Sequence, residues 1–447
     1  MNKELKLALK ILLLVVLSVA SLFGTVTALS ENDVIMPEGT PLEYLDLSRF
    51  YEKKVFTPPP ITYVTPTDLS SSSDAQEAVK AVPVHPPVPV TLDGGVGEQL
   101  NAIAAKYNCV SAQIAVIDDG YVSSVFSCGL ADRERHREIN DDTKIRVASL
   151  SKVLVGMAAM KAQEEGVFDL DDPLTDIVGF RVRNPHYTRC VLTMRSFLTH
   201  TATVNMYSEI SGMSLETFLR TPEIYTFTEP NTAEAWCYSN PGIRAAGGML
   251  EVILNRTLPE YTEEKLLDPI GADASFFASR LDDQSNIAAL YGGDLYATLS
   301  VDELLWKQYS TKPGSNSSIF AGGLVTSAKD YAKLMCVLLR DGEYDGMQLL
   351  SPQSVAEMEQ PNFVLDGFEQ CVILRHRGGM YNGRELYYHT GDAYGVLAFA
   401  SYDKASGEGV VVTTVGATSN RDAYDVPEVC GEFADYIYSQ VLDGKRA

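Results

Sequence analysis

The strongest constraint on the fold is a group of three strand-like segments near the C-terminus. They span 385–389, 396–402 and 409–415, and a predicted helix over 426–442 follows them. Residues 110–125 form a predicted hairpin much earlier in the chain. A chain with this order of elements is expected to build an antiparallel sheet covered by helices. The predicted fold class is therefore α/β, of the α+β type.

The amino-acid composition of the chain changes near residue 95. Residues 29–95 contain Pro58-Pro59-Pro60 and a run of four serines, a composition that favours extended, poorly packed chain. We expect this segment to be a spacer. The folded domain is expected over 96–447, with an inserted helical region at about 201–320, because that stretch lacks the alternation of strands.

The first 28 residues have the composition of an export signal. Lys3, Lys6 and Lys10 precede an apolar run over 11–28. The run ends in small residues, as cleavage by signal peptidase requires, and it is also just long enough to span a bilayer. A cleaved signal peptide and an uncleaved anchor both stay open. Under either one, the rest of the chain is expected to be secreted or held at the outer face of the cytoplasmic membrane, with membrane contact only through this segment.

Composition argues against three kinds of site. The formal net charge of −23 argues against a nucleic-acid partner, because phosphate binding needs a cationic surface. The seven cysteines are an odd number and none is in a C-x-x-C spacing, so neither a zinc ribbon nor a thioredoxin-like site is supported.

Cys109 and Cys128 flank a turn signal, Asp118-Asp119-Gly120, between two alternating runs. The spacing puts both sulfur atoms on the same face of the predicted hairpin. A cross-strand disulfide and two buried free thiols are both compatible with this pattern.

Ser149 and Lys152 begin a strongly apolar predicted helix over 148–163. Residues three apart share a helix face, so the two side chains can meet. A serine hydroxyl becomes a good nucleophile only when a nearby base takes its proton, and a lysine can be that base once desolvation lowers its pKa. The spacing alone is weak evidence, since Ser401 and Lys404 share it at an expected strand end. An ordinary helix cap is therefore the alternative.

Two further short motifs carry groups suited to the same chemistry. Tyr238 and Asn240 lie in a predicted loop before a helix, where a phenol can relay protons and an amide can donate to a substrate carbonyl. His389-Thr390-Gly391 ends a predicted strand, where a glycine lets a substrate approach the backbone and N–H groups can form an oxyanion hole. Taken singly, each motif favours a structural role, as a buried tyrosine or as a strand end that turns into a loop.

Taken together, in this order and context, the three motifs resemble those of the serine β-lactamase-like hydrolases. This family includes class C β-lactamases, penicillin-binding DD-peptidases and esterases. The resemblance covers about residues 96–444. It extends to four further segments, at 144–149, 165–173, 193–201 and 322–330.

The resemblance implies a role for each residue. Ser149 would be acylated, and Lys152 and Tyr238 would share its proton and pass one to the leaving group. The backbone N–H groups of Ser149 and Asp392 would form the oxyanion hole. The fold would be a five-stranded antiparallel sheet flanked by helices beside an all-helical region, with neither a metal nor an organic cofactor. The residues that contact substrate would be Asn240, His389, Thr390, Gly391 and Asp392.

Two departures from the family's pattern bear on the substrate. His389 stands where β-lactamases and many DD-peptidases have lysine, and a mostly neutral histidine favours esters, amides or D-amino-acid peptides over β-lactams. Ala202 replaces the start of a Ser-Gly turn, and Asp392 puts a carboxylate beside an oxyanion donor; both changes leave room for a catalytically weakened member of the family. The sequence therefore predicts a cell-envelope serine hydrolase that acts on a small-molecule or peptide substrate. The alternative is a catalytically weak homologue that binds peptidoglycan or another envelope partner.

Overall fold

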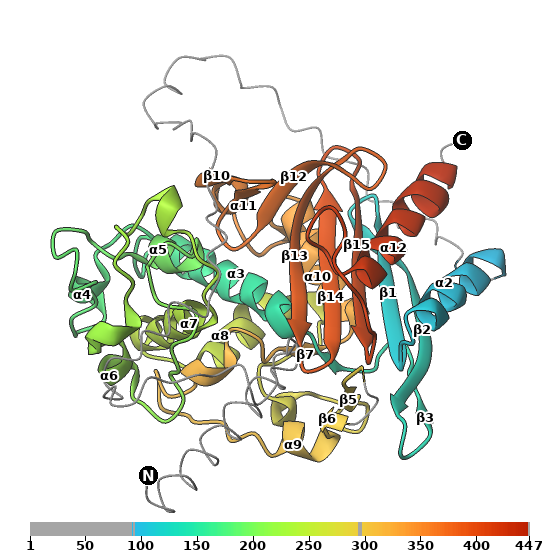
Figure 1. Ribbon diagram of the computed structural model, residues 1–447, viewed down its shortest axis with the longest axis horizontal. Coiled ribbons are helices and arrows are strands. Elements are labelled where there is room, and N and C mark those ends of the chain that lie inside the picture. The colour runs from blue at the N-terminus through green and yellow to red at the C-terminus, as the bar shows by residue number, and fades with distance from the viewer. Residues whose placement is uncertain (1–91, 93, 294–296, 446–447) are drawn as a thin grey trace, which may run out of the picture. The chain divides into compact units, whose positions relative to one another are not determined.

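The computed structural model describes residue 92, residues 94–293 and residues 297–445 (Figure 1). The predicted export signal over 1–28 and nearly all of the predicted spacer over 29–95 lie outside the described residues. Within the described ranges, no helix is both long and apolar enough to cross a membrane.

A nine-stranded antiparallel sheet forms the centre of the domain, in the order β10-β11-β12-β13-β14-β15-β1-β2-β3 (Figure 1). Strand β15 pairs with β1, so that the two ends of the folded domain meet in the sheet. The antiparallel sheet predicted from the sequence is thus confirmed. Its predicted strands are β1 (Ser111–Asp118), β2 (Tyr121–Asp132), β13 (Arg384–Ala393), β14 (Val396–Asp403) and β15 (Glu408–Val415).

The expected number of five strands is too low, because four strands in the outer parts of the sheet were missed. Three of them have only two or three residues, too few to show a period. The fourth reads Arg-His-Arg-Gly-Gly-Met and has no apolar alternation. These strands are β3 (Arg137–Glu138), β10 (Phe363–Leu365), β11 (Phe368–Gln370) and β12 (Arg375–Met380).

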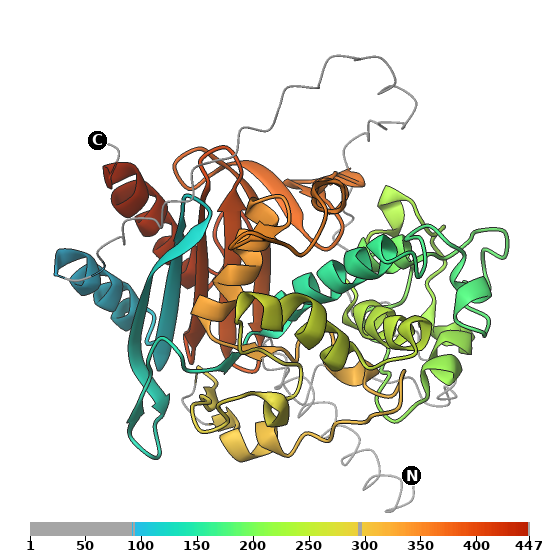
Figure 2. The same cartoon turned by 180° about the vertical axis from the view of Figure 1, so that it is seen from behind.

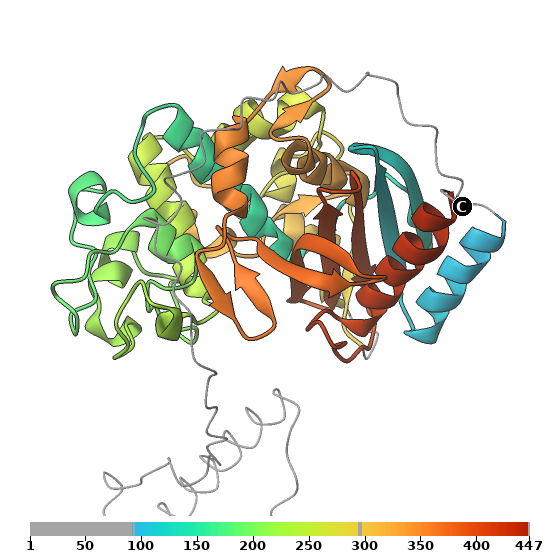
Figure 3. The same cartoon turned by 90° about the horizontal axis from the view of Figure 1, so that it is seen from above.

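Helices cover both faces of the sheet. Helices α2 (Gly95–Lys106) and α12 (Glu428–Tyr436) lie side by side on one face (Figure 3), and α10 (Ala328–Leu339) packs on the other. Strands β1 and β15 are buried over their whole length, because each contributes core side chains to both faces. The predicted C-terminal helix is confirmed, and its last part, Ile437–Leu442, widens into a π-helix.

A long helix leads from the sheet into the helical region. This helix, α3 (Ser151–Glu164), crosses the middle of the molecule (Figure 2) and packs against α7 (Asn240–Leu254). The region predicted to be helical at about 201–320 also holds α6 (Leu215–Arg220), α8 (Leu258–Thr262) and α9 (Val301–Leu305). The prediction omitted a short two-stranded sheet there, made of β5 (Leu290–Tyr291) and β6 (Ala297–Leu299).

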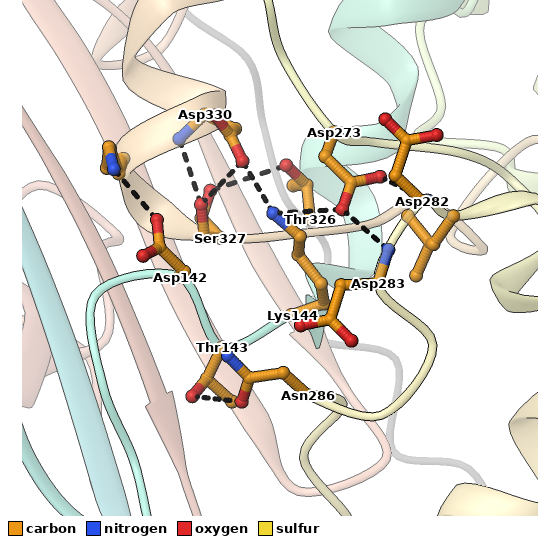
Figure 4. A network of polar contacts seen from close by, with 12 residues as sticks. Asp142, Thr143, Lys144, Asp273, Asp282, Asp283, Asn286, Thr326, Ser327 and Asp330 are labelled. Atoms are coloured by element: carbon orange, nitrogen blue, oxygen red, sulfur yellow. Dashed lines mark hydrogen bonds and ion pairs between the residues drawn. The ribbon is translucent and has the colours of Figure 1, made fainter.

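A buried ion pair holds the segment that leads to Ser149. Lys144 precedes β4 (Ile145–Arg146), which pairs with β7 (Val325–Thr326). Lys144 Nζ lies 2.7 Å from Asp330 Oδ2 and 3.4 Å from Asp273 Oδ2 (Figure 4). Burial opposes ionisation of Asp330, yet Lys144 and Lys333 hold the pKa of this carboxyl below its usual value. The charges of the pair therefore tie the segment to the start of α10.

All seven cysteines lie in the described ranges, and all are free thiols. Cys128 pairs across the hairpin with Ala112, and Cys109 lies before the start of β1. Burial raises the pKa of Cys109 to about 12 and that of Cys128 to about 11. Of the two alternatives that the sequence left open, the structure contains free thiols, and both are half-buried.

Candidate active site

Ser149 lies at a tight turn between β4 and α3. It is the middle residue of the 3₁₀ turn Ala148–Leu150, and Ala148 has a φ of 49°, which is strained for a residue with a Cβ. The turn packs closely against β13. A Cβ on Gly391 would lie 2.8 Å from the carbonyl oxygen of Val147. Gly391 therefore makes room for the backbone before the nucleophile, and not for substrate as expected.

We expect Gly391→Ala to lower the free energy of unfolding by about 1–3 kcal/mol, because the new methyl group must push β13 away from the nucleophile's turn. Urea denaturation measures this loss. Gly322→Ala is the matched control, since a Cβ there would also face Ala148 but no closer than 3.7 Å. The free energy of unfolding of this control should fall by only about 0.5 kcal/mol. Equal losses in the two variants would contradict the close approach at Gly391.

Lys152 is fully buried beside Ser149, with an exposed fraction of 0%. Its Nζ lies 2.7 Å from Ser149 Oγ and donates to the carbonyl oxygen of Ala321 at 2.6 Å. Burial, followed by the charges of Arg244 and Arg375, holds the pKa of Lys152 well below its usual range. A neutral amine in this position can accept the proton of Ser149.

The pKa of Tyr238 is raised, whereas that of Lys152 is lowered. Its hydroxyl shares a hydrogen bond with Ser149, and Lys152 Nζ lies 5.0 Å from the centre of its ring. Burial raises the pKa of Tyr238 to about 12, against the effects of that hydrogen bond and of Arg375. The phenol therefore keeps its proton near neutral pH. Opposite pKa shifts in neighbouring groups give Lys152 the character of a base and Tyr238 that of an acid.

Two buried histidines pack against Tyr238. The ring centres of His200 and His389 lie 4.6 Å and 6.4 Å from that of Tyr238. Burial and the charge of Lys152 hold the pKa of both histidines well below the usual range. His389 Nδ1 donates to the carbonyl oxygen of Thr390 at 2.7 Å. His389 is thus a neutral, buried residue near Tyr238 and is not among the residues that line the pocket at Ser149. That it contacts substrate stays a prediction.

A pocket of about 390 Å³ opens at Ser149. The described part of the chain holds no cluster of three or more metal-ligating side chains. The predicted residues that line the pocket are Ser149, Tyr238, Asn240, Thr390 and Asp392. The predicted residues that are buried outside its lining are Lys152, His389 and Gly391. The lining residues that the sequence analysis missed are Trp236, Arg375, Arg421 and Asp425.

Two of the missed residues are arginines that set the charge of the pocket. Arg421 Nη2 lies 3.0 Å from Asp392 Oδ2, so an ion pair neutralises the carboxylate beside the expected oxyanion donor. Arg375 has a side chain that is 11% exposed and lies 3.6 Å from Asp425. Its guanidinium packs 4.5 Å from the ring centre of Phe368. A fixed, nearly desolvated guanidinium of this kind is suited to a substrate carboxylate.

Comparisons with known sequences cover the same part of the chain. The sequence profile of the β-lactamase family matches residues 96–429. Protein Rv1367c of Mycobacterium tuberculosis is 28% identical over 256 residues, which are 52% of this chain and 62% of that protein. Esterase EstB of Burkholderia gladioli is 37% identical over 75 residues, which are 17% of this chain and 19% of EstB. The chain thus matches less than two thirds of the length of either relative.

A comparison with solved structures agrees. The D-alanine carboxypeptidase AmpC of Burkholderia cenocepacia superposes with a TM-score of 0.61 at 18% identity, over 77% of this chain and 97% of that one. This likeness shows a common fold, a large antiparallel sheet flanked by helices beside a helical region. All the residues of the candidate site lie within the range matched by the family profile. From that match and this fold, the chain belongs to the β-lactamase family.

Proposed function

We propose that this chain is a serine hydrolase that forms an acyl-enzyme at Ser149. One observation carries the proposal: Ser149 Oγ is in hydrogen-bond contact with both a buried lysine of lowered pKa and a tyrosine of raised pKa. A purely structural serine has no need of a base and an acid on the same oxygen. Groups with opposite pKa shifts around one nucleophile are the arrangement that acyl transfer requires.

The proton path follows from these two pKa shifts. As Ser149 Oγ attacks the substrate carbonyl, Lys152 takes the hydroxyl proton and Tyr238 gives its own proton to the leaving group. The backbone N–H groups of Ser149 and Asp392 hold the oxyanion. Water then loses a proton to the Tyr238 phenolate and attacks the acyl-enzyme. Ser149 leaves with the proton held by Lys152, which restores the starting state.

The scissile bond in this proposal is an ester, an amide or a D-amino-acid peptide bond. The names of EstB and of AmpC, an esterase and a D-alanine carboxypeptidase, support these classes. The neutral state of His389 argues against a charge at that position, but Arg375 supplies a cation to the pocket instead. A leaving group that carries a carboxylate, such as that of a β-lactam, therefore remains within the proposal.

We also propose that the chain is exported and acts in the cell envelope, secreted or anchored at the outer face of the cytoplasmic membrane. The lysines and the apolar run over 11–28 support export. In this location peptidoglycan is a candidate partner. The alternative, a catalytically weak homologue that only binds such a partner, is less well supported because the carboxylate of Asp392 is neutralised by Arg421.

A substrate panel tests this proposal. The purified chain is incubated with an uncharged short-chain ester, a D-amino-acid amide and a β-lactam, and turnover is measured for each. We expect hydrolysis of at least one of the three, with an acyl adduct on Ser149 that intact-mass spectrometry detects. Absence of turnover and of any adduct with all three would favour the non-catalytic alternative.

The pH dependence tests the role of Lys152. For an uncharged ester, kcat/KM should rise with pH on one limb, because Lys152 must lose its proton before it can act as a base. The midpoint should lie well below the 10.5 of an ordinary lysine, since burial lowers the pKa of Lys152. Activity should persist until Tyr238 loses its proton near pH 12. A midpoint near 10.5 would mean that the lysine is not desolvated in the working enzyme.

A further inference from the structure

A second pocket, of about 340 Å³, adjoins the first. Two elements contribute to both pockets. On α7, Asn240 lines the first pocket and Arg244, one turn further along the same helix face, lines the second. At the end of β13, Asp392 lines the first pocket and Tyr394, two residues later, lines the second. The two pockets are therefore neighbours, and we call the second one the arginine pocket.

The arginine pocket brings two guanidinium groups together. Arg146, three residues before the nucleophile, donates from Nε to the carbonyl oxygen of Gly322 at 2.7 Å, and its guanidinium lies 4.1 Å from the ring centre of Tyr394. Arg146 forms no ion pair with any residue that the structure describes. Arg244 Nη1 lies 3.3 Å from Glu209, but Arg244 Nε is buried without a hydrogen-bond partner. Burial and the charge of Arg244 lower the pKa of Arg146.

The carboxylates of this pocket are already engaged. Glu209 also accepts a hydrogen bond from the backbone N–H of Ser211 at 2.8 Å, and Glu303 accepts from Ser300 in the capping box of α9. Lys307 adds another positive charge to the lining. Two like charges held together in a partly buried site repel each other, and an anion between them removes that repulsion. Beside these charged groups the lining also includes apolar side chains, among them Phe276, Leu299, Leu304, Ile319 and Val325.

We propose that the arginine pocket binds a carboxylate on the acyl portion of the substrate, through Arg146 and Arg244. This inference rests on the proposed function. Tyr238, which gives its proton to the leaving group, lines the first pocket, so the leaving group occupies that pocket and the acyl portion extends the other way. The apolar lining contacts the carbon chain between the carboxylate and the scissile carbonyl. The substrate class is therefore an ester or amide of a dicarboxylic acid, or an acyl peptide with an acidic side chain.

A pair of esters tests the carboxylate. The mono-p-nitrophenyl ester of glutaric acid carries a free carboxylate on its acyl portion, and its methyl ester has the same chain without the charge. We expect the wild-type ratio of kcat/KM, charged over uncharged, to fall about tenfold to a hundredfold in Arg244→Gln and in Arg146→Gln, the size of a lost charged hydrogen bond. Arg244→Lys keeps the positive charge but cannot donate two parallel hydrogen bonds to a carboxylate. Its ratio should lie between those of the wild type and Arg244→Gln. Arg220→Gln, at an exposed arginine on α6, is the control and should not change the ratio.

Binding of glutarate separates this inference from the proposed function. Calorimetric titration of the Ser149→Ala protein with glutarate needs no catalysis, and Arg244→Gln in that background should weaken binding at least about tenfold. Equal affinities together with an unchanged ester ratio would overturn the arginine pocket, even if Ser149 is acylated normally. Loss of acylation at Ser149 alongside intact, Arg244-dependent glutarate binding would instead overturn the hydrolase and leave the pocket standing.

Discussion

Replacing Ser149 with alanine should abolish covalent labelling by a fluorophosphonate and lower kcat about ten-thousandfold or more, because the proposed acyl-enzyme forms on the oxygen that this change removes. Intact-mass spectrometry should count one adduct on the wild-type chain and none on Ser149→Ala. The label needs an oxygen that has a base within hydrogen-bond distance, and Ser149 Oγ has Lys152 Nζ at 2.7 Å.

Ser401→Ala is the matched control for this experiment. Ser401 also precedes a lysine by three residues, but it lies in β14, where its side chain is fully buried and its Oγ is 3.0 Å from the hydroxyl of Tyr438. This variant should be labelled like the wild type. Stoichiometric labelling that persists in Ser149→Ala would place the nucleophile elsewhere.

Lys152→Met and Tyr238→Phe should each lower the rate of acylation about a hundredfold or more, the scale for the loss of a positioned acid or base. Methionine is chosen at 152 because its length fills the buried space that alanine would leave empty. The two losses should be far from additive, since both residues contact Ser149 and act in the same acylation step. Stopped-flow measurement of acylation in the single and double variants gives the coupling.

The leaving group separates the two roles. A p-nitrophenolate leaves without a proton, whereas an amine does not, so Tyr238→Phe should slow an amide much more than a p-nitrophenyl ester. Lys152→Met should slow both substrates alike, because the base acts on Ser149 in either case. The same loss for both substrates in Tyr238→Phe would remove Tyr238 from the role of acid.

The central strands could be predicted because they are buried on both faces. Strands β1, β14 and β15 carry apolar side chains along their length, and a buried strand must show this in its sequence. Strand β12 is different. Its first residues are charged, and one of them, Arg375, points toward a pocket whose other walls come from distant parts of the chain. The local sequence pattern around Arg375 therefore does not reveal which distant residues share a pocket with it.

The sequence predicted which residues form the site, but not the direction in which each side chain of β13 points. His389-Thr390-Gly391 was placed at a strand end, whereas β13 continues to Ala393 and pairs with β14 through the motif. Successive side chains in a strand point to opposite faces, so His389 and Thr390 cannot both face the substrate. Thr390 and Asp392 line the pocket, and His389 turns towards Lys152. Recognition of the full strand would have led to this arrangement from the sequence.

Arg244 lies one helical turn after Asn240, and from this position it connects the proposed binding of the acyl chain with the protonation state of Lys152. Arg244 lies where the acyl chain is proposed to bind, and its charge also helps to keep Lys152 unprotonated. A descendant that exchanged Arg244 for a neutral residue would acquire a new substrate range and, by the same mutation, an activity optimum at higher pH. Substitutions at this one position would thus change the pH at which the protein works best together with the substrates that it accepts.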